Sequence, residues 1–131
     1  MMSKKHVLIV DDYQPNTVLV RSFLEEIGCT FSIAKDGEDA IRQTEEQRFD
    51  LILMDVQMPV MDGLKATRII REREKEQKIR RNNIIGMTAH ALKGDRERCI
   101  GVGMDEYLSK PFTAEELQQK VIKLIPMQNP G

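Results

Sequence analysis

The chain has 131 residues, a length typical of one ordinary domain with a single hydrophobic core. Hydrophobic residues make up 40% and charged residues 31%, and no apolar stretch approaches the length of a membrane span, so the composition indicates a soluble globular protein. The formal net charge of -1 gives no electrostatic bias toward nucleic acid or an anionic membrane, so we expect neither nucleic-acid binding nor membrane insertion.

The two cysteines carry no sign of a metal site. Cys29 and Cys99 lack C-x-x-C or metal-ligand spacing, and the first residues lack the apolar core of a secretory signal. We therefore expect a cytoplasmic protein, where a reducing environment leaves both cysteines as buried or half-buried free thiols.

Five short apolar segments alternate with stretches of helical periodicity. The predicted strands are residues 7–10, 30–34, 51–54, 84–88 and 106–109. Strand-helix alternation with short connections requires crossovers in a parallel sheet. The sequence therefore predicts an α/β fold, a five-stranded parallel sheet with helices on both faces, and a single domain over 1–131 with its core at about 5–125.

The helical segments carry start and stop signals. A helix should begin after Asp62, another should cover 91–102, and Thr113 and Glu116 have capping-box spacing at the start of the last one. The run 71–83, nearly all charge and amide, predicts a solvated helix end plus a loop. The first and last helices show apolar stripes, formed by Leu19, Val20, Phe23, Leu24 and Ile27 and by Leu117, Val121, Leu124 and Ile125.

The predicted strands end at residues fit for one chemistry. Asp11 and Asp12 follow the first strand, Asp55 the third, Thr88 ends the fourth and Lys110 follows the fifth. Parallel strands meet at one edge of the sheet, where open α/β folds bind ligands, so these residues should share a pocket. Three neighbouring carboxylates require counter-charge, which the Lys110 ammonium and a divalent cation supply. Oxygen ligands without Cys or His favour Mg²⁺ over zinc.

A carboxylate beside a cation can act as a nucleophile toward a phosphoryl donor, which predicts an aspartyl phosphate at Asp55. Lys110 and the metal would offset the transferring charge, and the Thr88 hydroxyl would donate a hydrogen bond to it. Each residue also has a plainer interpretation. The pair Asp11-Asp12 could cap the first helix, Lys110 could be a surface lysine, and Thr88 could be an ordinary β-branched strand residue.

With these residues in place, the chain resembles the response-regulator receiver domain over about residues 5–125. The resemblance rests on the acid pair, on the run 51–63, on Met87-Thr88-Ala89 and on the segment 107–112. It implies the flavodoxin-like strand order 2-1-3-4-5. It also implies a phosphoacceptor signalling switch that catalyses phosphoryl transfer to its own aspartate and slow autodephosphorylation, without being a conventional enzyme.

The resemblance assigns a role to each residue of the pocket. Asp55 is the phosphoacceptor, and Asp12, Asp55 and the backbone carbonyl of Gln57 are the Mg²⁺ ligands, with Asp11 helping through water. Lys110 contacts the phosphate, and the bond to the following Pro111 is cis in many relatives.

Thr88 and Tyr107 resemble a switch pair, in which the hydroxyl moves to the phosphate and the ring follows inward. Gln57 and His90 are candidates for tuning the access of the hydrolytic water. Tyr13, where relatives often carry a polar or acidic residue, could shield one side of the pocket.

The segment 87–99 is most similar to receivers of hybrid sensor histidine kinases. The expected partners are therefore a sensor histidine kinase, a histidine phosphotransfer protein, or both. Two other functions stay open. One is a Mg²⁺-dependent phosphohydrolase with an aspartyl-phosphate intermediate, although the haloacid dehalogenase pattern is Asp-x-Asp and the acids here are adjacent. The other is a receiver-like docking module that is not phosphorylated.

Overall fold

The computed structural model of the chain describes residues 4–58, 61–89 and 94–126. One parallel sheet runs through the molecule in the order β2-β1-β3-β4-β5, which confirms the predicted architecture and strand order. The strands are β1 His6–Val10, β2 Thr30–Ala34, β3 Leu51–Asp55, β4 Asn83–Thr88 and β5 Glu106–Ser109.

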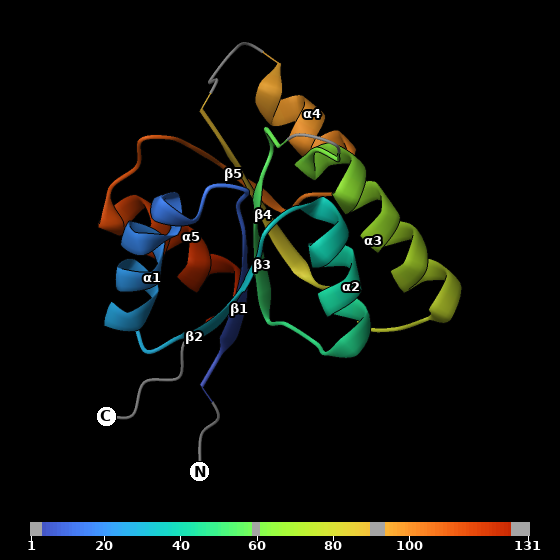
Figure 1. The fold of residues 1–131 in the computed structure, drawn as a ribbon, viewed down its shortest axis with the longest axis horizontal. Coiled ribbons are helices and arrows are strands. Elements are labelled where there is room, and N and C mark those ends of the chain that lie inside the picture. The colour runs from blue at the N-terminus through green and yellow to red at the C-terminus, as the bar shows by residue number, and fades with distance from the viewer. Residues whose placement is uncertain (1–3, 59–60, 90–93, 127–131) are drawn as a thin grey trace.

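Helices cover both faces of this sheet (Figure 1). On one face lie α1 Thr17–Glu26, preceded by the short 3-10 turn η1 Gln14–Asn16, and α5 Ala114–Leu124. On the other lie α2 Gly37–Glu46, α3 Gly63–Gln77 and α4 Asp95–Gly101. None of these described helices combines the length and the apolar character that a membrane span requires.

The central strands are buried on both sides because their side chains alternate between two cores. Val7 and Ile9 of β1 pack under α1 and α5, whereas Leu8 and Val10 pack under α2 and α3. Cys29 and Cys99 are buried free thiols, as expected.

Side-chain caps mark the starts of α2, α3 and α5. The Asp62 carboxylate accepts a hydrogen bond from the Lys65 N–H at 2.9 Å and starts α3. Thr113 and Glu116 form the predicted capping box at the start of α5. α4 is described only from Asp95 onward, so Leu92 and the rest of 90–93 lie outside the described residues.

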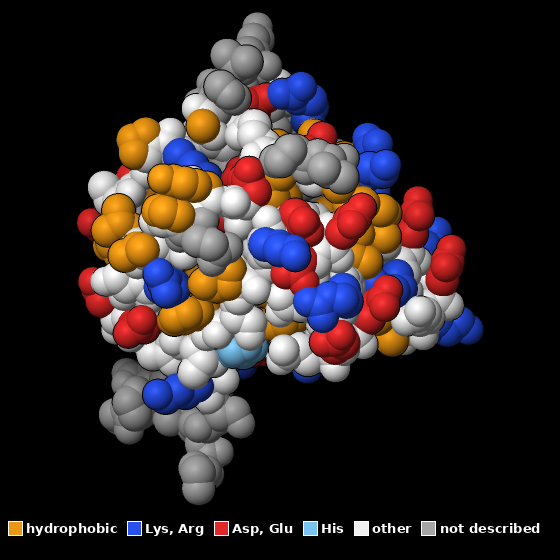
Figure 2. All heavy atoms as spheres, in the orientation of Figure 1, with side chains coloured by type: hydrophobic (Ala, Val, Ile, Leu, Met, Phe, Trp, Pro, Cys, Tyr) orange, Lys and Arg blue, Asp and Glu red, His pale blue; other side chains and the backbone are white. Residues whose placement is uncertain are grey.

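One apolar prediction is wrong in part. Leu19, placed in the stripe of α1, is 65% exposed, and the core face of that helix is formed by Val20 and Leu24 with Phe23 and Ile27 packed beside them. Apolar side chains accordingly gather on the surface over α1 (Figure 2), whereas charged side chains of both signs alternate over α2 and α3.

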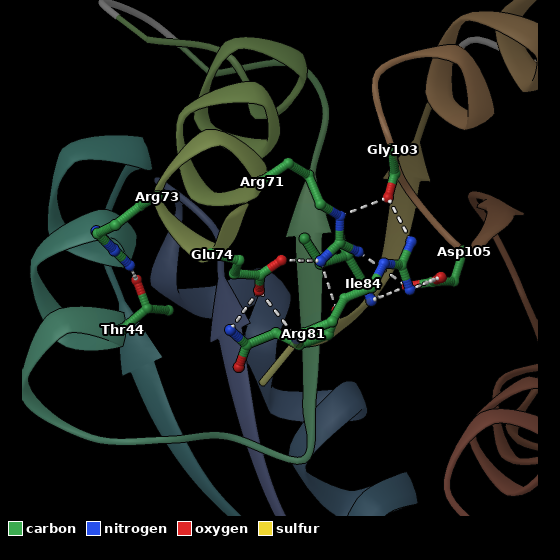
Figure 3. A network of polar contacts seen from close by, with 9 residues as sticks. Thr44, Arg71, Arg73, Glu74, Arg81, Ile84, Gly103 and Asp105 are labelled. Atoms are coloured by element: carbon green, nitrogen blue, oxygen red, sulfur yellow. Dashed lines mark hydrogen bonds and ion pairs between the residues drawn. The ribbon is translucent and has the colours of Figure 1, made fainter. Parts of the chain in front are cut away.

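The charged run 71–83 is also more structured than predicted. α3 continues to Gln77, and Arg71 turns inward toward Asp105 (Figure 3). Glu74 of the same helix is hydrogen-bonded to Asn82. Glu74 Oε1 accepts from Arg71 Nη1 at 2.7 Å, and Glu74 Oε2 accepts from the Asn82 backbone N–H at 2.7 Å. This part of the run is a buried polar network and not a solvated helix end.

The same guanidinium joins three segments. Arg71 Nε donates to the Gly103 carbonyl at 2.8 Å, and Nη2 contacts Asp105 Oδ2 at 3.0 Å. Asp105 Oδ2 also accepts from the Ile84 N–H at 2.8 Å. The network, comprising Arg71, Glu74, Arg81, Asn82 and Asp105, therefore ties α3 to the starts of β4 and β5.

Candidate functional site

The carboxyl ends of four strands bring the predicted residues to one rim. Asp11 and Asp12 follow β1, Asp55 is the last residue of β3, Thr88 the last of β4, and Lys110 follows β5. The register of the strands places these residues at the same height along the sheet edge, because Asp55 is opposite Met87 and Thr88 is opposite Ser109.

The three carboxylates form one cluster. Ligand oxygens of Asp11, Asp12 and Asp55 all lie within 4.8 Å of one another. Asp11 and Asp55 are only 2% and 4% exposed, whereas Asp12 is exposed. The cluster is therefore open to solvent on the Asp12 side.

The plainer interpretation of the acid pair as the cap of the first helix is wrong. α1 begins at Thr17 with Asn16 in the N-cap position. Asp11 Oδ1 instead accepts a hydrogen bond from the Tyr13 N–H at 2.9 Å and orders the turn that follows β1. Its Oδ2 faces the centre of the rim.

Lys110 provides the positive charge of the cluster. Its Nζ lies 3.6 Å from Asp11 Oδ2 and 3.7 Å from Asp55 Oδ2. The Lys110 N–H donates to the Thr88 carbonyl at 2.7 Å, and the Lys110–Pro111 bond is cis. One ammonium faces three carboxylates, so two negative charges remain uncompensated by these side chains.

The acidity of Asp55 reflects its burial and these neighbouring charges. The pKa of the Asp55 carboxyl is raised to about 6, mainly by burial and also by the charges of Asp11 and Asp12, against the opposing effects of Lys110 and the Gln57 N–H. A bound cation would remove much of this unfavourable energy. The site therefore has the charge and the oxygen donors suited to a hard divalent ion such as Mg²⁺.

The backbone around Asp55 is fixed by hydrogen bonds on both sides of Val56 and by a close contact with Gly63. The Val56 N–H donates to the Met87 carbonyl at 2.8 Å, and the Gly63 N–H donates to the Val56 carbonyl at 3.0 Å. A Cβ at Gly63 would overlap the Asp55 carbonyl oxygen, so only glycine fits there. The sequence analysis missed this contact, although a glycine directly after the capping Asp62 is a usable signal.

Thr88 is buried at the edge of the cluster and is engaged by Gln57. Gln57 Nε2 donates to Thr88 Oγ1 at 2.8 Å, and the Ala89 N–H donates to Gln57 Oε1 at 3.2 Å. The Gln57 backbone N–H donates to Asp55 Oδ1 at 3.2 Å. The family resemblance implies a role for the Gln57 carbonyl as a metal ligand and for Gln57 in the access of water, but the sequence gives no sign of this connection to β4.

Tyr107 and Tyr13 are the remaining predicted residues that the structure describes. Tyr107 is half-buried, and its hydroxyl lies 3.1 Å from Ser109 Oγ. Tyr13 is 59% exposed. His90 lies outside the described residues, so its tuning role stays a prediction. A hollow of about 550 Å³ beside the rim is lined by Val56, Gln57, Met58, Asp62, Leu64 and Arg98.

This sheet and rim define an α/β domain with an acidic, lysine-bearing cleft. The family model described as the response regulator receiver domain matches residues 7–122, which is most of the chain. The chain therefore belongs to the response regulator receiver domain family.

Curated relatives are sensor kinases. The chain is 40% identical over 127 residues to the sensor protein GacS of Pseudomonas syringae pv. syringae, covering 95% of the chain and 14% of that protein. It is 36% identical over 120 residues to the signal transduction histidine-protein kinase BarA of Escherichia coli K12, covering 92% of the chain and 13% of that protein. The chain thus spans about a seventh of the length of these relatives.

Two solved structures share the fold over nearly the whole chain. The receiver domain of sensor histidine kinase PA1611 from Pseudomonas aeruginosa PAO1, solved with a magnesium ion in its active site cleft, is 40% identical with a TM-score of 0.82 and covers 95% of this chain and 100% of that one. The receiver domain of Ssk1 from Saccharomyces cerevisiae, solved in complex with the histidine phosphotransfer protein Ypd1, is 31% identical with a TM-score of 0.85 and covers 95% and 90%.

Proposed function

We propose that this receiver domain is a phosphoacceptor switch that takes a phosphoryl group from a phosphohistidine onto Asp55. The single observation that supports this most strongly is the cluster itself. A nearly buried carboxylate lies within 4.8 Å of two others and 3.7 Å from the Lys110 ammonium. Gathering like charges this way is unfavourable unless the site binds a cation and an anionic group together.

In the proposed reaction an Asp55 carboxylate oxygen attacks the phosphorus of the N-phosphorylated imidazole. The new P–O bond forms as the P–N bond breaks, and the imidazole nitrogen keeps the electron pair and takes a proton. Lys110 Nζ, which faces Asp55 Oδ2, is placed to balance charge on the transferring group. Asp55 must be ionised to react. Because its pKa is raised to about 6, the rate of phosphoryl transfer should fall below about pH 6.

Asp11, Asp12, Asp55 and the Gln57 carbonyl would hold the Mg²⁺. The bound ion would neutralise the carboxylates and stabilise charge on the phosphoryl oxygens. The oxygen-only donor set fits this ion, and the related PA1611 receiver carries magnesium in its cleft.

The partners we propose are a sensor histidine kinase, a histidine phosphotransfer protein, or both. The GacS and BarA relatives are sensor kinases, and the Ssk1 receiver was solved with the phosphotransfer protein Ypd1. We also propose that residues 1–131 act as one receiver domain in the cytoplasm, with Thr88 and Tyr107 as the switch pair. The buried free thiols of Cys29 and Cys99 agree with a reducing compartment.

The test is phosphoryl transfer from phosphoramidate, a small donor with a P–N bond, in the presence of Mg²⁺. We expect a hydroxylamine-sensitive adduct on Asp55 that is lost with chelator and in Asp55→Asn. Asp36→Asn is the matched control, because Asp36 caps α2, is not part of the carboxylate cluster, and can be replaced by asparagine, which caps equally well. A label that persists in Asp55→Asn contradicts the proposal, and steady turnover of p-nitrophenyl phosphate favours a phosphohydrolase instead.

A further inference from the structure

The side chain of Gln57 connects the acceptor loop to the end of β4. Its carboxamide donates to the Thr88 hydroxyl at 2.8 Å and accepts from the Ala89 N–H at 3.2 Å. Its backbone N–H meanwhile donates to Asp55 Oδ1 at 3.2 Å. One residue therefore contacts both the acceptor carboxylate and two polar groups at the end of the neighbouring strand.

The hydroxyl of Thr88 is engaged by this connection. Among the described residues, the Asp55 carboxylate contacts the Gln57 N–H and the Lys110 ammonium. The Thr88 hydroxyl oxygen is the acceptor of the bond from Gln57 Nε2. Displacement of this hydroxyl toward a group attached to Asp55 would stretch that bond and break it.

We propose that the Gln57 carboxamide is a latch that holds Thr88 and Ala89 in the resting arrangement and is released when Asp55 carries a phosphoryl group. This inference rests on the proposed function and adds a positioning residue to the same site. The bond that Thr88 accepts from the Gln57 amide is neutral, whereas a hydrogen bond that the Thr88 hydroxyl donates to a charged phosphoryl oxygen is roughly twofold stronger. The modification therefore favours the displacement of Thr88 that opens the latch.

The surroundings allow the latch to open and close. Gln57 is exposed, and it lines the hollow of about 550 Å³ next to the rim. A released carboxamide can therefore turn into solvent and bond to water, which keeps the cost of opening small. The resting contacts then re-form when the phosphoryl group is lost.

The test compares Gln57→Met with the wild type. Methionine keeps the length of the side chain but makes neither hydrogen bond. We expect Gln57→Met to bind beryllofluoride, a phosphoryl mimic, about fivefold more tightly in the presence of Mg²⁺, because no latch opposes binding. Fluorine NMR titration measures the affinity, and the amide resonance of Ala89 should shift in the free variant because its acceptor is gone.

A double-mutant cycle separates a latch from a general packing effect. In a Thr88→Val background one latch bond is already absent, so Gln57→Met should improve beryllofluoride affinity by only about twofold. Gln118→Met is the matched control, because the Gln118 amide also bridges two elements, donating to the Phe23 carbonyl at 3.0 Å away from the rim. It should leave the affinity unchanged.

The outcomes distinguish this inference from the function on which it rests. If the wild type binds beryllofluoride and Gln57→Met binds it equally or more weakly, the latch is wrong while the proposed function stands. If the wild type does not bind it with Mg²⁺, both are overturned. An unshifted Ala89 amide in the free variant also rejects the latch.

Discussion

Two clusters of charged side chains lie at opposite ends of the sheet, and they differ in charge balance. At the strand starts, Arg71 and Arg81 face Glu74 and Asp105, so the network is neutral. At the carboxyl ends, the described residues place three carboxylates beside one cationic side chain, Lys110. Both clusters contain buried charge, but only the second leaves negative charge that a ligand can neutralise.

The difference teaches that burial alone does not identify a functional site. The network shows good hydrogen-bond geometry, because Glu74 accepts from Arg71 at 2.7 Å and from the Asn82 backbone N–H at 2.7 Å. Such a cluster holds α3, β4 and β5 together (Figure 3). At the rim, by contrast, the pKa of Asp55 is raised to about 6, mainly by burial. The ionised Asp55 carboxylate therefore lowers the free energy of unfolding at neutral pH.

Removing one acid from each cluster should therefore change stability in opposite directions. Glu74→Gln leaves the Arg71 guanidinium with a neutral partner and places an amide donor or a misaligned oxygen against the Asn82 N–H. We expect a loss of roughly 4 kcal/mol in the free energy of unfolding, measured by urea titration. Glu76→Gln, on the exposed side of the same helix, should change it by less than about 0.5 kcal/mol.

Asp55→Asn should instead stabilise the protein. At pH 7 with chelator present, removing the charge of Asp55 should raise the free energy of unfolding by up to about 3 kcal/mol, as the shift of its pKa from 3.8 to about 6 requires. Thermal and urea unfolding of the two proteins measure this gap. Equal stability would mean that the rim carries no excess charge in solution.

The gap between these two proteins should depend on pH with a definite sign. The folded-state pKa of Asp55 is raised, so protonation favours the fold, and the wild type loses this stability as the pH rises from about 4 through 6. We expect the advantage of Asp55→Asn to shrink to about 0.5 kcal/mol at pH 4. A gap that is constant between pH 4 and 7 would point to packing instead of charge.

The smallest effect is expected at the exposed margin of the network. Arg81 pairs with Asp105, but its side chain is 52% exposed. Arg81→Met should cost less than about 1 kcal/mol, because water replaces most of the interaction. A loss as large as that of Glu74→Gln would show that the network depends on both arginines.

The two clusters also show what the sequence could reveal. Asp55, Thr88 and Lys110 each stand at the end of an apolar run, and the parallel sheet converts that sequence position into spatial proximity. The fold followed from the same alternation of strands and helices. The parallel sheet and the meeting of the acids at one rim could therefore be predicted from the residues, whereas the strand order was implied by the family resemblance.

The rest depended on tertiary contacts that leave no local pattern. Glu74 and Asn82 lie within a run of charge and amide that is typical of a solvated loop, and only the position of Arg71 above the start of β4 buries them. Leu19 fits the helical stripe of α1 but lies at the edge of the buried face. The Gln57 amide likewise meets Thr88 across 31 residues of sequence.

The most direct test of the central claim is a calorimetric titration of the wild type and Asp55→Asn with Mg²⁺ at pH 7. Excess negative charge at the rim predicts that the wild type binds one Mg²⁺ per chain. The affinity should fall as the pH drops below about 6, and binding should be abolished or strongly weakened in Asp55→Asn. Equal Mg²⁺ binding by the two proteins, or no binding by the wild type, would contradict the account.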